Sequence, residues 1–255
     1  MRILRLLKTE FLKQKGSFLW AVIFLIPLGT TGAALLDIYL RQYDKFATMA
    51  IGKGFTLWEA LLLESHNNIG WGRFIPIFIG VICAVVYYTE YKSDSWKNIL
   101  SLPIEKRRIY FSKFITILLF SLILITLNSL GLILIGTIYN FPGPTNWLLF
   151  AKYVLYQFCA IMGVAAIHNW LSSYFKNMVI PIFMGVGGIV VSSVFTTNMP
   201  HVGKYFPYVH QYLIGGWFTE GYNGLDPFTG VYEGIISGLI ILFLGYLEFR
   251  NRDIV

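Results

Sequence analysis

The sequence predicts an all-α membrane protein with six transmembrane helices, and three observations support this fold class. Of its 255 residues, 56% are hydrophobic and only 13% are charged, whereas soluble domains have about 25% charged residues. Several apolar stretches approach or exceed the roughly 18 residues that a helix needs to cross a bilayer. Neither an internal repeat nor a disordered linker separates these stretches. We therefore expect a single transmembrane domain over residues 1–255.

The N-terminal segment 1–15 precedes the first apolar stretch and is basic and amphipathic. Its apolar residues recur at helical spacing among five lysines and arginines. Such a helix lies in the headgroup plane, so membrane lipid is its expected partner. A cleaved signal peptide is the alternative interpretation. The long basic part, the long apolar part and the further spans argue against cleavage.

The six spans follow from the apolar stretches, taken in chain order. We expect them at about 18–36, 74–88, 114–138, 153–171, 178–196 and 231–249. Segment 37–72, with its glycines and asparagines, is expected to be a polar connection. Segment 90–113 is the densest charged part of the chain. A short turn at 140–144 and a tight loop at Lys176 and Asn177 separate the later spans.

The distribution of lysine and arginine predicts the orientation, because cytoplasmic loops retain these residues. With the N-terminus inside, 14 of the 20 lysines and arginines lie in cytoplasmic segments. The opposite orientation would place the 90–113 cluster outside. Both termini are therefore expected in the cytoplasm. Topology accounts for the net charge of +7, and we expect no nucleic-acid partner.

The second long outer connection, 199–230, is rich in aromatic residues. Two interpretations remain open for it and for the tryptophans of the first connection, Trp58 and Trp71. The aromatic rings form an anchoring belt at the membrane interface, or segment 199–230 forms a re-entrant hairpin that gates the protein or binds an apolar ligand.

Motifs of enzymes and metal sites are absent from the sequence. It contains no phosphate-binding loop, H-E-x-x-H, C-x-x-C or G-x-S-x-G motif. We therefore expect no catalytic residue, no bound metal and no cofactor on this chain. The cysteines Cys83 and Cys159 lie in apolar stretches and are interpreted as small buried hydrophobic residues.

A few polar residues interrupt the spans, and burying them in lipid is costly unless they are paired. They hydrogen-bond between helices or line a substrate pathway, and both interpretations stay open. The pathway candidates are Asn128, His168, Asn169, Ser192 and Ser193. Gly234 and Gly238 form a G-x-x-x-G pattern that favours close helix contacts and weakly indicates a dimer face.

The charged connection after the second span reads Glu90-Tyr-Lys-Ser-Asp-Ser-Trp-Lys-Asn-Ile-Leu-Ser-Leu-Pro103, followed by Lys106-Arg-Arg108 and Ser112-Lys113. It resembles the cytoplasmic connection of ABC transporter permeases of the type-2 exporter family. Those permeases have a Glu near the end of the second helix, a run ending in Pro, a basic pair and a Ser-Lys. The N-terminal Glu10-Phe-Leu-Lys13 and the C-terminal Phe249-Arg-Asn-Arg-Asp-Ile254 resemble the family's two ends.

The resemblance implies a coupling helix that receives motion from a separate ATPase. The residues that it assigns to coupling are Glu90, Ser93, Asp94, Trp96, Lys97, Ile99, Leu100 and Pro103. ATP and Mg would bind to that partner. A second permease subunit, identical or paralogous, would pair along the first and fifth helices. The alternative interpretation of the segment is an amphipathic linker whose charges serve topology alone.

Within the family, the chain is most similar to permeases of lantibiotic immunity and bacitracin resistance. This resemblance implies the plasma membrane of a Gram-positive bacterium and an antimicrobial peptide, or another amphipathic molecule, as cargo. The alternative function is a non-transporting membrane sensor or assembly protein that binds peptide through its outer loops.

Overall fold

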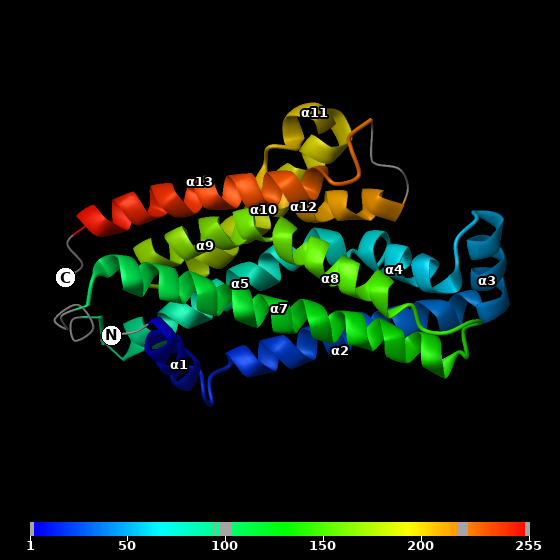
Figure 1. The fold of residues 1–255 in the computed structure, drawn as a ribbon, viewed down its shortest axis with the longest axis horizontal. Coiled ribbons are helices and arrows are strands. Elements are labelled where there is room, and N and C mark those ends of the chain that lie inside the picture. Colours follow the sequence, from blue (N-terminus) through cyan, green and yellow to red (C-terminus); the bar gives the residue numbers. More distant parts are fainter. Residues whose placement is uncertain (1–2, 94, 97–103, 219–223, 253–255) are drawn as a thin grey trace.

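A computed structural model describes residues 3–93, 95–96, 104–218 and 224–252. Within these residues every regular element is a helix. The helices run largely along the long axis of the molecule, and the two chain ends lie at the same end of the bundle (Figure 1). We call this the terminal end, and the end that carries α3 (Tyr43–Gly52) the far end.

Helix lengths agree with five of the predicted spans. The helices in chain order are α1 (Ile3–Lys13), α2 (Leu19–Arg41), α3, α4 (Leu57–Asn67), α5 (Trp71–Lys92), α7 (Lys106–Ile138), α8 (Trp147–Ala160), α9 (Met162–Tyr174), α10 (Val179–Asn198), α11 (Pro200–Gly203), α12 (Pro207–Leu213), the 3₁₀ helix η1 (Ile214–Phe218) and α13 (Thr229–Asn251). Five of them, α2, α5, α7, α10 and α13, are long and apolar enough to cross a membrane.

The predicted span 153–171 is broken. It falls on α8 and α9, which bend by 42° at Ile161. Counting each bent helix pair as one crossing raises the number of candidate spans from five to as many as seven. Two termini at one end require an even number of crossings, as six would give (Figure 1). The count of six and the cytoplasmic side of the termini stay predictions.

The expectation that 37–72 is a polar connection is wrong. This segment forms α3 and α4, which meet at 100°. The side chain of Thr56 accepts a hydrogen bond from the backbone of Glu59, whose carboxylate accepts one in return, so a capping box starts α4. Leu61 and Leu62 are buried in the core. The largely apolar segment 57–63 therefore forms a packed helix. The polar residues around it hide this helix in the sequence pattern.

Segment 199–230 contains α11, α12 and η1, and α12 packs against α5, α10 and α13. Its Tyr208, together with Trp58 and Trp71 from the first long connection, is buried inside the protein. An anchoring belt is therefore wrong for these three rings. Tyr205 is exposed, so the anchoring belt stays a prediction for this ring. A re-entrant path for the segment stays a prediction.

The G-x-x-x-G pattern on α13 serves contacts within the chain. A Cβ atom added to Gly234 would lie 2.6 Å from the Cα atom of Ala160, and one added to Gly238 would lie 2.7 Å from the Cβ atom of Met162. Only glycine lets α13 approach α8 and α9 this closely. The structure therefore uses these glycines for contacts within the chain, and it does not support the dimer face that the pattern weakly indicates.

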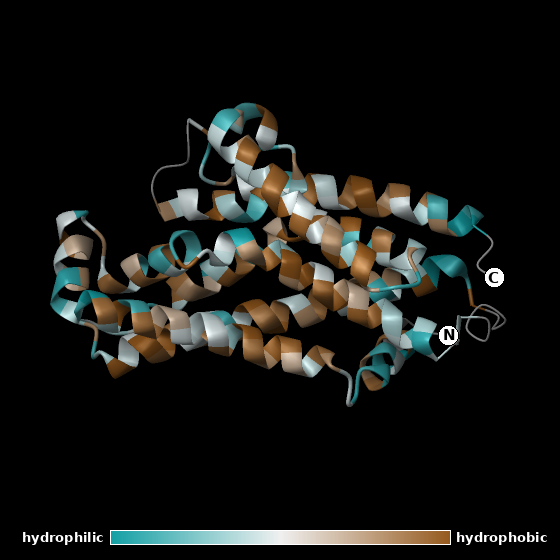
Figure 2. Cartoon of the chain, turned by 180° about the vertical axis from the view of Figure 1, so that it is seen from behind, coloured by the Kyte–Doolittle hydropathy of each residue, from teal (hydrophilic) through white to brown (hydrophobic). Residues whose placement is uncertain are grey.

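Hydrophobic residues occupy much of the length of the long helices, as the brown bands show (Figure 2), and many of their large side chains are exposed. Burial differs among them, with 61% of the apolar window of α5 buried but only 28% for α2 and 22% for α10. α5 is thus a central helix, and α2 and α10 present apolar surface to lipid or to a second protein.

Candidate functional site

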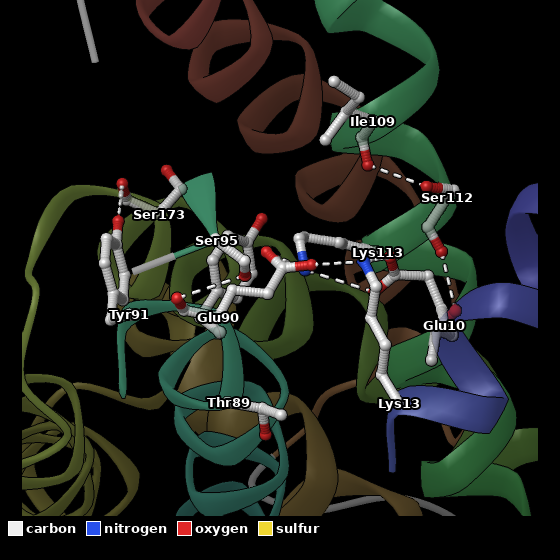
Figure 3. A network of polar contacts seen from close by, with 12 residues as sticks. Glu10, Lys13, Thr89, Glu90, Tyr91, Ser95, Ile109, Ser112, Lys113 and Ser173 are labelled. Atoms are coloured by element: carbon white, nitrogen blue, oxygen red, sulfur yellow. Dashed lines mark hydrogen bonds and ion pairs between the residues drawn. The ribbon is translucent and has the colours of Figure 1, made fainter. Parts of the chain in front are cut away.

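Four charged side chains meet at the terminal end, and we call them the ion cluster: Glu10, Lys13, Glu90 and Lys113 (Figure 3). The Nζ atom of Lys113 lies 3.1 Å from Oε2 of Glu10 and 2.7 Å from Oε2 of Glu90. The Nζ atom of Lys13 lies 2.7 Å from Oε1 of Glu10 and 2.6 Å from Oε1 of Glu90. Each carboxylate thus bridges the same two ammonium groups, and the four charges sum to zero.

Lys113 is the centre of the ion cluster. Its side chain is 1% exposed and lies on α7, one residue before the predicted start of the third span. The ammonium also lies over two aromatic rings, 4.8 Å from the centroid of Tyr87 and 5.4 Å from that of Trp96. Two carboxylates and two ring faces therefore surround an ammonium with three N–H donors, which compensates for its burial.

Helix α1 brings Glu10 into the ion cluster by packing on α7. Leu6 and Glu10 are buried on one face of α1, and Gln14, directly after the helix, continues this four-residue spacing and is buried too. Leu12, by contrast, is exposed. The amphipathic helix predicted from the sequence is confirmed as a helix, but its buried face is largely polar because it meets the charges of α5 and α7.

The last turn of α5 places Glu90. Its backbone carbonyl accepts hydrogen bonds from the amide and hydroxyl of Ser95, at 3.1 and 3.3 Å. The hydroxyl of Ser93 donates to the carbonyl of Thr89 at 3.0 Å. These serines satisfy carbonyls that a helix end leaves unpaired. Cations near this end are further favoured by the negative end of the helix dipole.

Trp96 connects the ion cluster to the C-terminal helix. It is buried and stacks on Tyr87, with ring centroids 6.0 Å apart, and its ring meets that of Phe249 on α13 edge-on at 6.3 Å. Beyond Phe249, the guanidinium of Arg252 donates to the carbonyl of Ser173 at 2.6 Å. The C-terminal segment is therefore fixed to the same end of the bundle.

Opposing effects set the pKa of Glu10. Burial alone would raise the pKa of this carboxyl. The ammonium groups of Lys113 and Lys13 outweigh that effect and hold the pKa below its ordinary value of 4.5. Glu10 is consequently ionised at neutral pH, as the ion cluster requires.

The predicted coupling residues have four different outcomes. Glu90 is in the ion cluster, Ser93 caps α5, and Trp96 is packed inside the protein instead of being available to a partner's groove. The others, Asp94, Lys97, Ile99, Leu100 and Pro103, lie outside the described residues. The ion cluster thus lies at the base of the predicted coupling segment.

The five pathway candidates form hydrogen bonds within the protein. Asn128 accepts from Thr30 of α2 at 2.7 Å, Asn169 accepts from Tyr87 of α5 at 3.0 Å, and His168 is 2.9 Å from the hydroxyl of Tyr208. The hydroxyls of Ser192 and Ser193 both donate to the carbonyl of Ile189 on their own helix. The first three therefore link helices, as the structural interpretation of the sequence expects.

Reasoning from the sequence missed the roles of Glu10, Lys13 and Lys113. At the membrane surface neither a glutamate on a basic amphipathic helix nor a lysine directly before an apolar span needs a buried partner, so charge alone did not single these residues out. All three belong to the motifs that carried the family resemblance. That they meet in one cluster could not be predicted from the sequence, because Lys113 lies about 100 residues from Glu10 in the chain.

Fold and site together define a multi-pass helical membrane protein whose charged segments converge at one end. Comparison with protein families identifies the family: the family model described as "ABC-2 family transporter protein" matches residues 6–192 of the chain. The chain belongs to the ABC-2 transporter family. The matched region includes the whole ion cluster. Comparisons with curated proteins and with solved structures give no significant match.

Family membership establishes the chain as the membrane component of an ABC-2 type transporter. Such a permease lacks ATPase activity, so the chain is not itself the ATPase. Permeases of this family generally pair with ATPase subunits.

Proposed function

We propose that this chain is the permease subunit of an ATP-driven exporter in the plasma membrane of a Gram-positive bacterium. Two permease subunits pair along α2 and α10, and ATP-binding subunits dock on segment 90–103 at the cytoplasmic face. ATP and Mg bind to those subunits. The cargo is an amphipathic molecule, with a lantibiotic or bacitracin-like peptide as the leading candidate.

The ion cluster is the observation that carries the coupling part of this proposal. It joins α1 to the two helices that flank segment 93–105, since Glu90 on α5 precedes the segment and Lys113 on α7 follows it. A displacement of the segment by a bound ATPase would therefore be transmitted to three helices through short ionic contacts. A linker that served only topology would need its positive charges but not this arrangement.

Exposed apolar surface supports pairing along α2 and α10. Leu25 and Leu28 on α2 are 64% and 65% exposed, and Phe183 on α10 is 73% exposed. A second subunit would cover such side chains. Lipid would cover them equally well, so the pairing needs its own test by crosslinking of cysteines at these positions.

Docking can be tested by co-expressing the tagged chain with an ABC ATPase that a neighbouring reading frame is found to encode. We expect Asp94→Lys to abolish copurification, because it reverses a charge in the proposed docking segment. Asp44→Lys, the same reversal on α3 at the far end, is the matched control and should retain the ATPase. Equal retention by both variants would contradict docking at this segment.

Cargo can be tested separately by measuring the survival of cells that express the complete transporter in the presence of lantibiotic or bacitracin. Protection that disappears with Asp94→Lys and persists with Asp44→Lys supports peptide export. If ATPase binding is intact but no protection is seen, the transporter has another cargo. If no ATPase binds at all, the non-transporting alternative gains support.

A further inference from the structure

A cavity of about 620 Å³ lies beside the ion cluster, between the α1–α2 turn and the last two turns of α5. Three lysines line it, namely Lys13, Lys15 and Lys92. Gly16, with φ +79°, lets the chain turn sharply here. The cavity is thus a basic recess where the end of α1 meets the first long helix.

Within the part of the chain that the structure describes, no carboxylate compensates the charge of this recess. Lys13 is paired within the ion cluster, whose charges balance. The ammonium groups of Lys15 and Lys92 form no ion pair with any described residue, and no carboxylate is among the described residues that line the cavity. Two unpaired ammonium groups on opposite walls favour a ligand with at least one negative charge.

The rest of the cavity wall combines three hydroxyl side chains, those of Ser17, Thr89 and Ser93, with an apolar part. Phe18 is 67% exposed and Tyr88 is 37% exposed, and Met178 closes the wall near the start of α10. Lipid-facing side chains explain exposed rings on a membrane helix. Here the exposed rings share one cavity with Lys15 and Lys92.

One face of α5 continues from the cavity into the span. Lys92, Tyr88, Val81 and Phe74 lie on this face because their spacings repeat the helical period. Phe74 is 48% exposed, and Val81 is half-buried. From Tyr88 to Phe74 the face extends about 21 Å, more than the roughly 15 Å of hydrocarbon in one leaflet. The face is therefore long enough to accompany an acyl chain, with Tyr88 and Phe74 as its exposed residues and Val85 between them only 5% exposed.

We propose that this cavity is a binding site for an anionic phospholipid. The phosphate lies between Lys15 and Lys92, and an acyl chain follows the Tyr88–Phe74 face of α5. The proposal depends only on the membrane location of the chain and not on its cargo or its ATPase. The lipid would join α1 to α5 beside the ion cluster, so the membrane would become part of the coupling end.

Binding of phosphatidylglycerol to the purified full-length chain can be measured by native mass spectrometry, with phosphatidylcholine as the neutral comparison. Each lysine near an anionic headgroup contributes about 1 kcal/mol, which is roughly a fivefold change in affinity. We therefore expect Lys15→Ala/Lys92→Ala to weaken phosphatidylglycerol binding roughly 25-fold. Binding of phosphatidylcholine should not change.

The matched control is Lys8→Ala/Lys45→Ala, which removes the same charge from exposed lysines outside the cavity. It should bind phosphatidylglycerol within about twofold of the unmodified chain. Thermal unfolding of both double variants verifies that they are folded. Equal weakening by the two variants, or no weakening by either, would overturn the site.

Two further arms distinguish other ligands. Glycerol phosphate and inorganic phosphate should compete poorly, because they lack the acyl chain. If they displace phosphatidylglycerol at equal concentration, the site binds free phosphate and the lipid proposal fails. If Lys15→Ala/Lys92→Ala loses the ATPase while lipid binding is unchanged, the lysines serve a protein partner instead.

Discussion

Two buried polar regions of this permease are built with different chemistry. The ion cluster at the terminal end contains two carboxylates and two ammonium groups, joined by four N–O contacts of 2.6 to 3.1 Å. The middle of the bundle uses neutral pairs instead, such as His168 with Tyr208 and Asn128 with Thr30, at 2.9 and 2.7 Å. Both regions join helices that are far apart in the sequence.

The difference lies in how each region responds to the loss of one contact. A neutral hydrogen bond contributes about 0.5–1.5 kcal/mol, so single bonds can be exchanged when helices move. Removing one member of a buried ion cluster leaves an unpaired charge and costs several times more. We infer that α1, α5 and α7 move as one unit at the terminal end, while the helices in the middle can change partners.

The largest effect is expected from Lys113→Met, which leaves two buried carboxylates facing only Lys13. We expect a loss of about 3–5 kcal/mol in the free energy of unfolding, measured by thermal and denaturant unfolding of the purified protein. Lys8→Met removes an exposed lysine of α1 and should leave stability unchanged. A small loss for Lys113→Met would mean that water reaches the ion cluster.

The double variant Glu90→Met/Lys113→Met separates stability from coupling. It leaves Glu10 and Lys13 as a balanced pair, and replacing buried ion pairs by apolar residues is often neutral. We therefore expect its stability to recover most of the loss of Lys113→Met. ATP-dependent activity of the complex should stay impaired, because the ionic link between α5 and α7 is gone. Recovery of both properties would contradict a coupling role.

An intermediate effect is expected from Gly238→Ala, which tests packing in the middle region without changing any polar group. The new Cβ atom would lie 2.7 Å from the Cβ atom of Met162 and 2.9 Å from its carbonyl carbon. Overpacking of this kind costs about 1–3 kcal/mol. Gly187→Ala on α10 has open space around it and should cause no loss. Unfolding temperatures of the two variants provide the comparison.

A smaller effect is expected from Tyr208→Phe, which removes one neutral hydrogen bond and leaves Nε2 of His168 without this partner. The loss should be about 1 kcal/mol. Tyr205→Phe changes an exposed ring on the same segment and is the control. A loss for Tyr208→Phe as large as that of Lys113→Met would remove the distinction between the two regions.

The sequence predicts the long helices well because their signal is local. An apolar run of sufficient length forms a helix wherever it packs, as α7 shows. The helix α4 was missed because its apolar run is short and lies among polar residues, and its burial depends on neighbours from other parts of the chain. The ion cluster was missed for the same reason: Glu10 and Lys113 meet only after α1 has packed on α7.

The smallest effect concerns pH and tests the charge of Glu10 in the ion cluster. Burial would raise the pKa of Glu10, but Lys113 and Lys13 lower it below 4.5. Because the folded pKa is lower than the unfolded one, Glu10 contributes stability above about pH 4.5, and this contribution is lost as the pH falls through the folded pKa. The stability difference between the unmodified chain and Glu10→Gln should therefore be constant near neutral pH and shrink below pH 4.5. A difference that does not change with pH would show that the charge of Glu10 contributes nothing, and that only its shape holds α1 against α7.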